Sequence, residues 1–148
     1  MLDCNGSQAT VTSLVKEKKT ASPPKLYDLT TLQRDANRIL GFTAKQTLEY
    51  TQSLYEDKLT TYPRTDSQFL SDDMETTAGN VIGAICSVIP FAHDIRTQPD
   101  IRRVMNSKKV TDHHAIIPTV EILNADLSAL PDGERKVLFL IADRLLCA

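Results

Sequence analysis

The sequence predicts a mainly α-helical domain with a helix-turn-helix or winged-helix-like core and a few short β-strands. Apolar residues recur at helical spacing in four separate stretches, and capping residues, glycine or proline stand at their ends. Residues typical of strands occupy only short runs between them. The chain has 148 residues, of which 41% are hydrophobic, and this is enough for one hydrophobic core.

The first element that the sequence predicts is a strand at residues 9–18, because β-branched residues alternate there. No neighbouring segment offers it a partner strand, so we expect it to pair with a sheet elsewhere in a longer protein. Residues 18–25 contain two adjacent prolines and few apolar side chains, which predicts a connector. We therefore assign residues 1–25 to a strand and linker from a neighbouring domain, and residues 26–148 to the main domain.

Two helices with a short turn between them follow. Thr30 or Thr31 can cap the first, and Gly41 stands where a left-handed glycine ends a helix. Thr43 caps the second helix. The expected buried positions are Leu32, Ala36, Ile39 and Leu40 in the first, and Ala44, Leu48, Thr51, Leu54 and Tyr55 in the second. Residues 59–62 have β character and precede a proline, so the order of elements resembles a winged-helix core.

Two further helices complete the predicted domain. Ser71, followed by two aspartates, begins the third helix, whose apolar period continues until Pro90. A short helix and a basic turn are expected within residues 100–111, and an extended segment at 112–119. The last helix begins near Pro131, and its apolar positions are Val137, Leu138, Ile141, Leu145 and Leu146.

Composition excludes several classes of protein. The 17 basic and 19 acidic residues give a net charge of −2, whereas a freestanding nucleic-acid binder usually has a basic excess. Apolar runs are too short to span a membrane and the N-terminus lacks a signal-peptide pattern, so we expect an intracellular, cytoplasmic protein with no membrane partner. Cys4, Cys86 and Cys147 are odd in number and far apart, which predicts neither a disulfide framework nor a metal site.

The first segment with potential chemistry is T-Y-P-R-T-D-S. Tyr62 offers a phenol nucleophile, and Arg64 can bind a phosphate with two parallel hydrogen bonds. The phenol has an ordinary pKa of about 10, which a nearby cation lowers. Thr65, Asp66 and Ser67 can orient both groups. A plainer interpretation is a loop in which the tyrosine packs and the three polar side chains cap a turn, and the residues alone leave both open.

The second segment is D-H-H-A-I-I-P-T, which ends at Thr119. His113 and His114 are adjacent on an extended stretch and point to opposite sides, so they do not readily bind one metal ion. One of them can donate a hydrogen bond to a phosphate or transfer a proton, or it can be a buried, hydrogen-bonded residue. Two basic clusters flank the two segments: Lys16, Lys18 and Lys19, and Arg102, Arg103, Lys108 and Lys109.

Taken together, the two segments resemble the active-site tyrosine region of type IA DNA topoisomerases. The resemblance covers residues 9–148, and its motifs are most similar to the bacterial topoisomerase III branch. Five ordered pieces carry it, at residues 24–33, 37–42, 54–56, 59–67 and 112–119.

This resemblance implies a role for each motif residue. Tyr62 matches the tyrosine that attacks a DNA phosphodiester, forms a 5′-phosphotyrosine bond and frees a 3′-hydroxyl, with resealing that needs no ATP. Arg64 matches the arginine that engages the scissile phosphate, and His113 matches the histidine that hydrogen-bonds near it. The implied DNA-contacting residues are Thr65, Asp66, Ser67, His114 and Thr119. His114 stands where the topoisomerase I branch often has glutamate.

The resemblance also implies parts that this chain lacks. Members of the family are several times longer, and their toprim domain supplies the acidic residues that hold Mg²⁺, a general-acid glutamate and a phosphate-binding lysine. The chain then corresponds to the central, tyrosine-bearing domain, preceded by a strand from the gate domain. Its implied partners are single-stranded DNA and the remaining domains, at the bacterial nucleoid. We expect the isolated chain to be inactive, because the transition-state charge lacks most of its stabilisation.

Two other functions remain open at this stage. The first is a non-catalytic winged-helix module that binds duplex DNA, which the two helices and the following strand suggest. The second is a domain used only for protein interaction.

Overall fold

The computed structural model describes residue 6 and residues 10–19, 22–93 and 99–148. In this part of the chain the α-helices are α1 (Leu29–Leu40), α2 (Ala44–Glu56), α3 (Glu75–Val88) and α4 (Asp132–Leu146). Short 3₁₀ turns join them: η1 (Asp72–Met74), η2 (Pro90–Ala92), η3 (Ile101–Val104), η4 (Ser107–Lys109) and η5 (Val120–Leu123). The predicted mainly α-helical fold class is confirmed.

β-structure in the described residues consists of isolated bridges. The bridged pairs are Tyr27 with Ile116, Thr60 with Pro118, and Leu70 with Met105. The strand predicted at residues 59–62 is therefore only one bridge, and these parts of the chain contain no hairpin that would form a wing. The physical reason lies in Pro63 and Pro118, which have no backbone N–H and cannot extend a ladder of hydrogen bonds.

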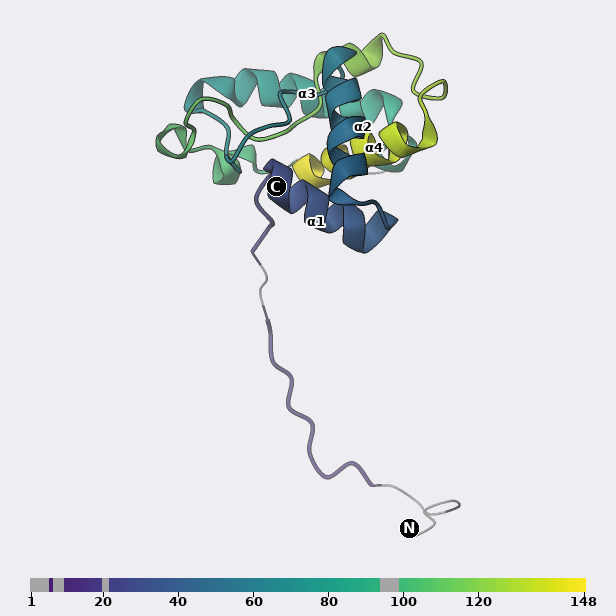
Figure 1. Ribbon diagram of the computed structural model, residues 1–148. Helices are drawn as coiled ribbons and strands as arrows, with labels where there is room; N and C mark the ends of the chain where they lie inside the picture. The colour runs from purple at the N-terminus through teal and green to yellow at the C-terminus, as the bar shows by residue number, and fades with distance from the viewer. Residues whose placement is uncertain (1–5, 7–9, 20–21, 94–98) are drawn as a thin grey trace.

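The N-terminal segment extends away from the helical body (Figure 1). Its residues 10–19 form no strand, and Val11, Leu14 and Val15 are 81%, 89% and 82% exposed. Within the described part of the chain these residues have no partner strand for their backbone N–H and C=O groups, so the predicted strand does not form there. Ala9, Cys4 and part of the predicted connector lie outside the described residues. Pairing of this segment with another domain stays a prediction.

Local side chains define the ends of α1 and α2. Asp28, rather than Thr30 or Thr31, caps α1, and its carboxylate accepts a 2.6 Å hydrogen bond from the backbone N–H of Thr31. A carboxylate also suits the positive end of the helix dipole. Gly41 ends α1 in the left-handed conformation with φ of 73°, and Thr43 caps α2, as predicted.

The buried face of α2 differs from the predicted one. Thr47, Thr51 and Leu54 are buried, whereas Ala44 and Tyr55 are exposed. Both threonines bury their hydroxyl groups because each donates to the carbonyl four residues earlier, at 3.0 Å and 2.6 Å. Thr47 and Thr51 thus behave as core residues, and the exposed Tyr55 can contact another loop.

The later elements follow the sequence predictions closely. A 3₁₀ turn after Ser71 leads into α3, and α3 ends before Pro90. The short helix expected within residues 100–111 is η3, and the basic turn is η4. Pro131 immediately precedes α4, which buries all but one of its predicted apolar positions, the half-buried Leu146.

The helices pack around a single core in which α2 contacts both α1 and α4, and α3 contacts η5 (Figure 1). The approach of α2 to α4 is close at Gly133, where an added Cβ would lie 2.5 Å from the Tyr50 ring. A larger residue at this position in the first turn of α4 would have to displace the end of the Tyr50 side chain. Within the described residues, each helix is too short or too polar to cross a membrane.

A polar cluster joins the start of the domain to α1 and α4. The Tyr27 hydroxyl donates to Asp35 at 3.0 Å and accepts from Arg144 at 2.8 Å. Arg144 also bonds to Asp35 and to the backbone carbonyl of Lys25, and its guanidinium lies 4.1 Å from the Tyr27 ring centroid. Burial raises the pKa of Tyr27 above its ordinary value, although the Arg144 charge opposes this shift. The phenol therefore stays neutral and keeps donating to the carboxylate.

Candidate active site

Two irregular loops lie side by side and carry both sequence motifs. The backbone N–H of Thr61 donates to the Ile117 carbonyl at 2.9 Å. The Thr61 hydroxyl donates to the Ala115 carbonyl at 3.2 Å and accepts from the Ile117 N–H at 3.0 Å. A threonine side chain thus supplies bonds that a regular ladder would otherwise provide, and it fixes Tyr62 next to the histidine pair.

Thr65 and Ser67 hold the same loops together further along. Both are buried, with exposed fractions of 7% and 5%. The Thr65 hydroxyl donates to the His113 carbonyl at 2.9 Å and accepts from the Ser67 N–H at 3.1 Å. The Ser67 hydroxyl donates to the Lys109 carbonyl at 3.0 Å. Their predicted contact with DNA stays a prediction, since both hydroxyl groups already have partners inside the protein.

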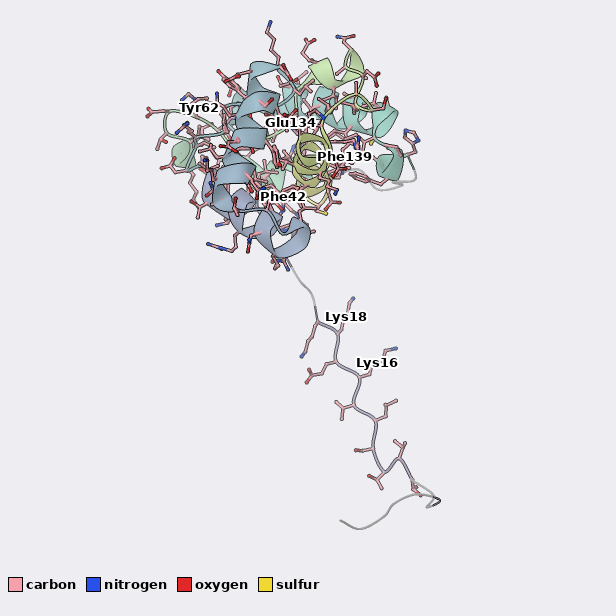
Figure 2. The ribbon with its side chains drawn as sticks, turned by 45° about the vertical axis from the view of Figure 1, so that its right-hand side comes forward. Lys16, Lys18, Phe42, Tyr62, Glu134 and Phe139 are labelled. Carbon is pink, nitrogen blue, oxygen red and sulfur yellow. The ribbon has the colours of Figure 1, made fainter. Side chains whose placement is uncertain are left out.

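Tyr62 lies at an edge of the helical body, away from Phe42 and Phe139 (Figure 2). It is half-buried, and its ring centroid lies 4.4 Å from that of His113 with 46° between the planes. On another side the Tyr55 ring packs against it edge-on at 5.4 Å. Two rings thus pack on the Tyr62 side chain, which stays partly exposed.

An open hollow of about 460 Å³ lies beside this tyrosine and shares His113 with it. Its lining residues are Asp28, Leu29, Thr30, Arg64, Thr65, Asp66, Thr111, Asp112 and His113. The N-terminus of α1 forms one wall, because the Leu29 N–H donates to the Thr65 carbonyl at 3.1 Å. Arg64 and His113 give the hollow a guanidinium and an imidazole that can bind a phosphate, whereas Asp28, Asp66 and Asp112 place three carboxylates on the same lining. An anion is therefore favoured only beside Arg64 and His113.

The remaining predicted site residues have different surroundings. Asp66 is exposed and accepts a hydrogen bond from the Thr111 hydroxyl at 3.3 Å. The His114 Nδ1 donates to the Ala115 carbonyl at 2.8 Å, and His114 does not line the hollow. The Thr119 hydroxyl donates to the Lys58 carbonyl and accepts from the Glu121 N–H at 3.2 Å, which caps η5. The structure thus brings Tyr62, Arg64, Thr65, Asp66 and His113 together and leaves His114 and Thr119 outside.

Sequence reasoning missed three contributors to this site. Tyr55 was expected on the buried face of α2, but it packs on Tyr62 instead. Thr61 and Asp28 hold the loops and the α1 wall in place through side-chain bonds. The sequence signal for Tyr55 is that it belongs to the motif piece at residues 54–56, which carries part of the resemblance but predicts no contact with Tyr62 by itself.

Comparison with known proteins identifies the family. A family model described as DNA topoisomerase matches residues 1–148. The chain belongs to this DNA topoisomerase family. It is 48% identical over 147 residues to the DNA topoisomerase 3 of Bacillus subtilis, covering 95% of this chain and 20% of that protein. It is 45% identical over 144 residues to the DNA topoisomerase 3 of Bacillus cereus, covering 93% of this chain and 19% of that protein.

A solved structure agrees with this assignment. Full-length topoisomerase I from Thermotoga maritima superposes with a TM-score of 0.59 and 29% identity, over 86% of this chain and 20% of that one. The resemblance to type IA enzymes of the bacterial topoisomerase III branch is therefore confirmed. The chain spans about a fifth of the length of the curated relatives that it matches.

The type IA resemblance implies a magnesium ion in the complete enzyme. Within the described residues, no group of three His, Cys, Asp or Glu side chains is placed to hold a metal ion. This part of the topoisomerase chain does not fit the ion, and we derive no step from a metal held here.

Proposed function

We propose that this chain is the tyrosine-bearing domain of a type IA topoisomerase and that Tyr62 is its nucleophile. The Tyr62 oxygen forms a bond to the phosphorus of a DNA phosphodiester, and the bond from phosphorus to the 3′ oxygen breaks. The phenol loses its proton, and the departing 3′ oxygen gains one. One phosphate ester replaces another, so resealing is the reverse reaction and needs no ATP.

The observation that carries this proposal is the packing of the Tyr62 ring against His113 at 4.4 Å, next to a hollow that Arg64 also lines. His113 is positioned to hydrogen-bond a phosphate that lies next to the phenol. Arg64 is exposed in the same hollow, where a guanidinium can bind two phosphate oxygens and stabilise the charge that develops during transfer. Thr65 and Ser67 act as positioning residues, because their hydroxyl groups bond the two loops to each other.

The complete enzyme would pass a strand through the transient break in single-stranded DNA and then reseal it, changing DNA topology at the nucleoid. The other domains would supply the metal site and the rest of the DNA-binding surface. The isolated chain should not cleave DNA at a useful rate, because positioned charges usually contribute the largest part of transition-state stabilisation.

The test inserts residues 1–148 in place of the matching segment of the Bacillus subtilis DNA topoisomerase 3. Single-stranded DNA labelled at one end is mixed with this chimera and magnesium, and the reaction is stopped with detergent. We expect a covalent adduct that Tyr62→Phe abolishes. Tyr50→Phe is the matched control, since it removes a hydroxyl from a tyrosine of α2 that packs on Phe42 outside the site, and it should retain the adduct. An adduct that persists in Tyr62→Phe would contradict the proposal.

A winged-helix module that binds duplex DNA has less support. Helices α1 and α2 form the predicted pair, but the charged residues of α2 are Lys45, Glu49 and Glu56. A recognition helix needs cations that face the phosphates. The winged-helix alternative predicts that the chain alone binds duplex DNA tightly and with a steep salt dependence. We expect weak binding or none.

A further inference from the structure

A second cationic surface lies next to the candidate active site, which we call the Phe69 platform and define as Lys25, Phe69, Arg103 and Lys109. The Lys25 ammonium lies 5.3 Å from the centroid of the half-buried Phe69 ring, and the Lys109 ammonium lies 4.8 Å from it. Two cations from distant parts of the chain thus gather at one aromatic side chain. The negative face of the ring attracts each of them, but nothing in this arrangement cancels their mutual repulsion.

The platform borders a hollow of about 450 Å³. Its lining residues are Ser22, Pro23, Pro24, Lys25, Phe69, Arg103 and Val104, which include two cations and no acidic side chain. None of them lines the hollow beside Tyr62. The two adjacent prolines restrict φ in the backbone of this wall.

The charges of the platform are poorly balanced by the protein itself. Among the described residues, Lys25 and Lys109 have no carboxylate within ion-pair distance, whereas Arg103 pairs with Asp100 at 3.1 Å. The whole chain carries a net charge of −2, so acidic groups are not scarce. Unpaired cations that gather on an acidic protein point to an anionic ligand.

Hydrogen bonds connect the platform to the loops of the candidate active site. The Lys109 carbonyl accepts from the Ser67 hydroxyl at 3.0 Å, and the Phe69 carbonyl accepts from the Ala115 N–H at 2.9 Å. Ser67 in turn bonds to Thr65, whose hydroxyl holds the His113 carbonyl. The platform is therefore bonded directly to the loops that carry Tyr62 and His113.

We propose that the Phe69 platform binds backbone phosphates of the single-stranded DNA on which Tyr62 acts, outside the hollow that holds the cleaved phosphate. That the ligand is the single-stranded DNA cleaved by Tyr62 rests on the proposed function. Lys25 and Lys109 each neutralise a phosphate, Phe69 directs the two ammonium groups, and Arg103 extends the cationic surface. The contact carries no sequence information, because all nucleotides present the same phosphate.

The test measures binding of a fluorescent oligothymidylate to the 148-residue chain by anisotropy at several salt concentrations. Each phosphate contact to a single strand contributes about 0.7 to the salt slope, or about fivefold in affinity near 0.1 M salt. We therefore expect the Lys25→Gln/Lys109→Gln variant to bind about 25-fold more weakly, with a slope smaller by about 1.4. The Lys25→Arg/Lys109→Arg variant should bind as tightly as the unmodified chain, since it keeps both positive charges.

Lys45→Gln/Lys136→Gln is the matched control, because it changes the net charge equally with two exposed lysines from other elements. It should bind within about twofold of the unmodified chain, given that removing distant charges has little effect in salt. The proposal is overturned if both double variants lose the same affinity or if the unmodified chain does not bind at low salt. It is also overturned if duplex DNA binds more tightly, or if inorganic phosphate competes as well as the oligonucleotide. The trapping assay tests Tyr62 separately, so either proposal can fail alone.

Discussion

Replacing Thr65 by valine tests how the two loops of the site are held together. Valine has nearly the shape of threonine, so packing is kept while two hydrogen bonds are lost. These are the bond from the Thr65 hydroxyl to the His113 carbonyl at 2.9 Å and the bond from the Ser67 N–H to that hydroxyl at 3.1 Å. No ladder of strand hydrogen bonds takes their place, because only isolated bridges join the described parts of these loops.

The expected magnitude follows from burial. Ser67 is only 5% exposed, so its N–H is left without a partner at a cost of about 1–3 kcal/mol, and losing the bond to His113 costs about 1 kcal/mol more. Burying an additional methyl group offsets about 1 kcal/mol of this loss. We therefore expect Thr65→Val to lower the free energy of unfolding by about 2 kcal/mol.

Urea denaturation followed by circular dichroism measures this loss. With a denaturant slope of about 2 kcal/mol per molar, the midpoint should fall by about 1 M. The matched control is Thr76→Val, an exposed threonine on α3, which should change the free energy of unfolding by no more than about 0.5 kcal/mol. Equal midpoints for the two variants would refute the view that the Thr65 hydroxyl fastens these loops.

Two further predictions concern the packing and the charges of the core. Gly133→Ala should lower the free energy of unfolding by about 1–3 kcal/mol, because the new Cβ would lie 2.5 Å from the Tyr50 ring. Thermal denaturation measures this loss of stability. An unchanged midpoint would mean that the ring moves aside freely. The second prediction concerns Asp35. Partial burial raises the pKa of its carboxyl group, but this effect is outweighed by hydrogen bonds, of which that from Tyr27 is the largest, and by nearby positive charges. The pKa therefore lies below its ordinary value. A carboxyl group with a lowered folded-state pKa stabilises the fold above its unfolded pKa of about 4 and loses this effect as pH falls through the folded value. Asp35→Asn should therefore make stability less dependent on pH below about pH 4, as urea titrations between pH 2 and 7 would show; an unchanged acid dependence would contradict this.

Much of the fold follows from local sequence patterns. Gly41, Thr43 and Pro131 mark helix ends that depend only on backbone conformation and nearby hydrogen bonds. Asp28 takes the cap expected of Thr30 or Thr31, since three neighbouring residues can all serve as caps and the carboxylate satisfies the helix dipole best. In α2 the predicted burial of Thr51 and Leu54 is confirmed, whereas Ala44 and Tyr55 are exposed and Thr47 is buried in addition, because its hydroxyl bonds to its own helix.

The parts that sequence could not predict depend on contacts between distant residues. The pattern of residues 9–18 is typical of a strand, but a strand forms only beside a partner. The motif around Tyr62 identified a candidate nucleophile, yet its pairing with His113 joins positions that are 51 residues apart in the sequence. The supporting role of Thr61 depends on the same long-range contact, so no local rule distinguishes it from any loop threonine.

The cluster around Tyr27 determines how mechanical load enters the domain. A pull on the extended N-terminal segment arrives at Lys25, whose carbonyl is held by Arg144 on α4. Tyr27 then shares the load with α1 through Asp35, before the chain reaches the loops of the candidate active site. These bonds and the guanidinium packed on the Tyr27 ring link the start of the domain to both α1 and α4. We therefore expect a pull on this segment to be transmitted first to α1 and α4 rather than to the loops around Tyr62.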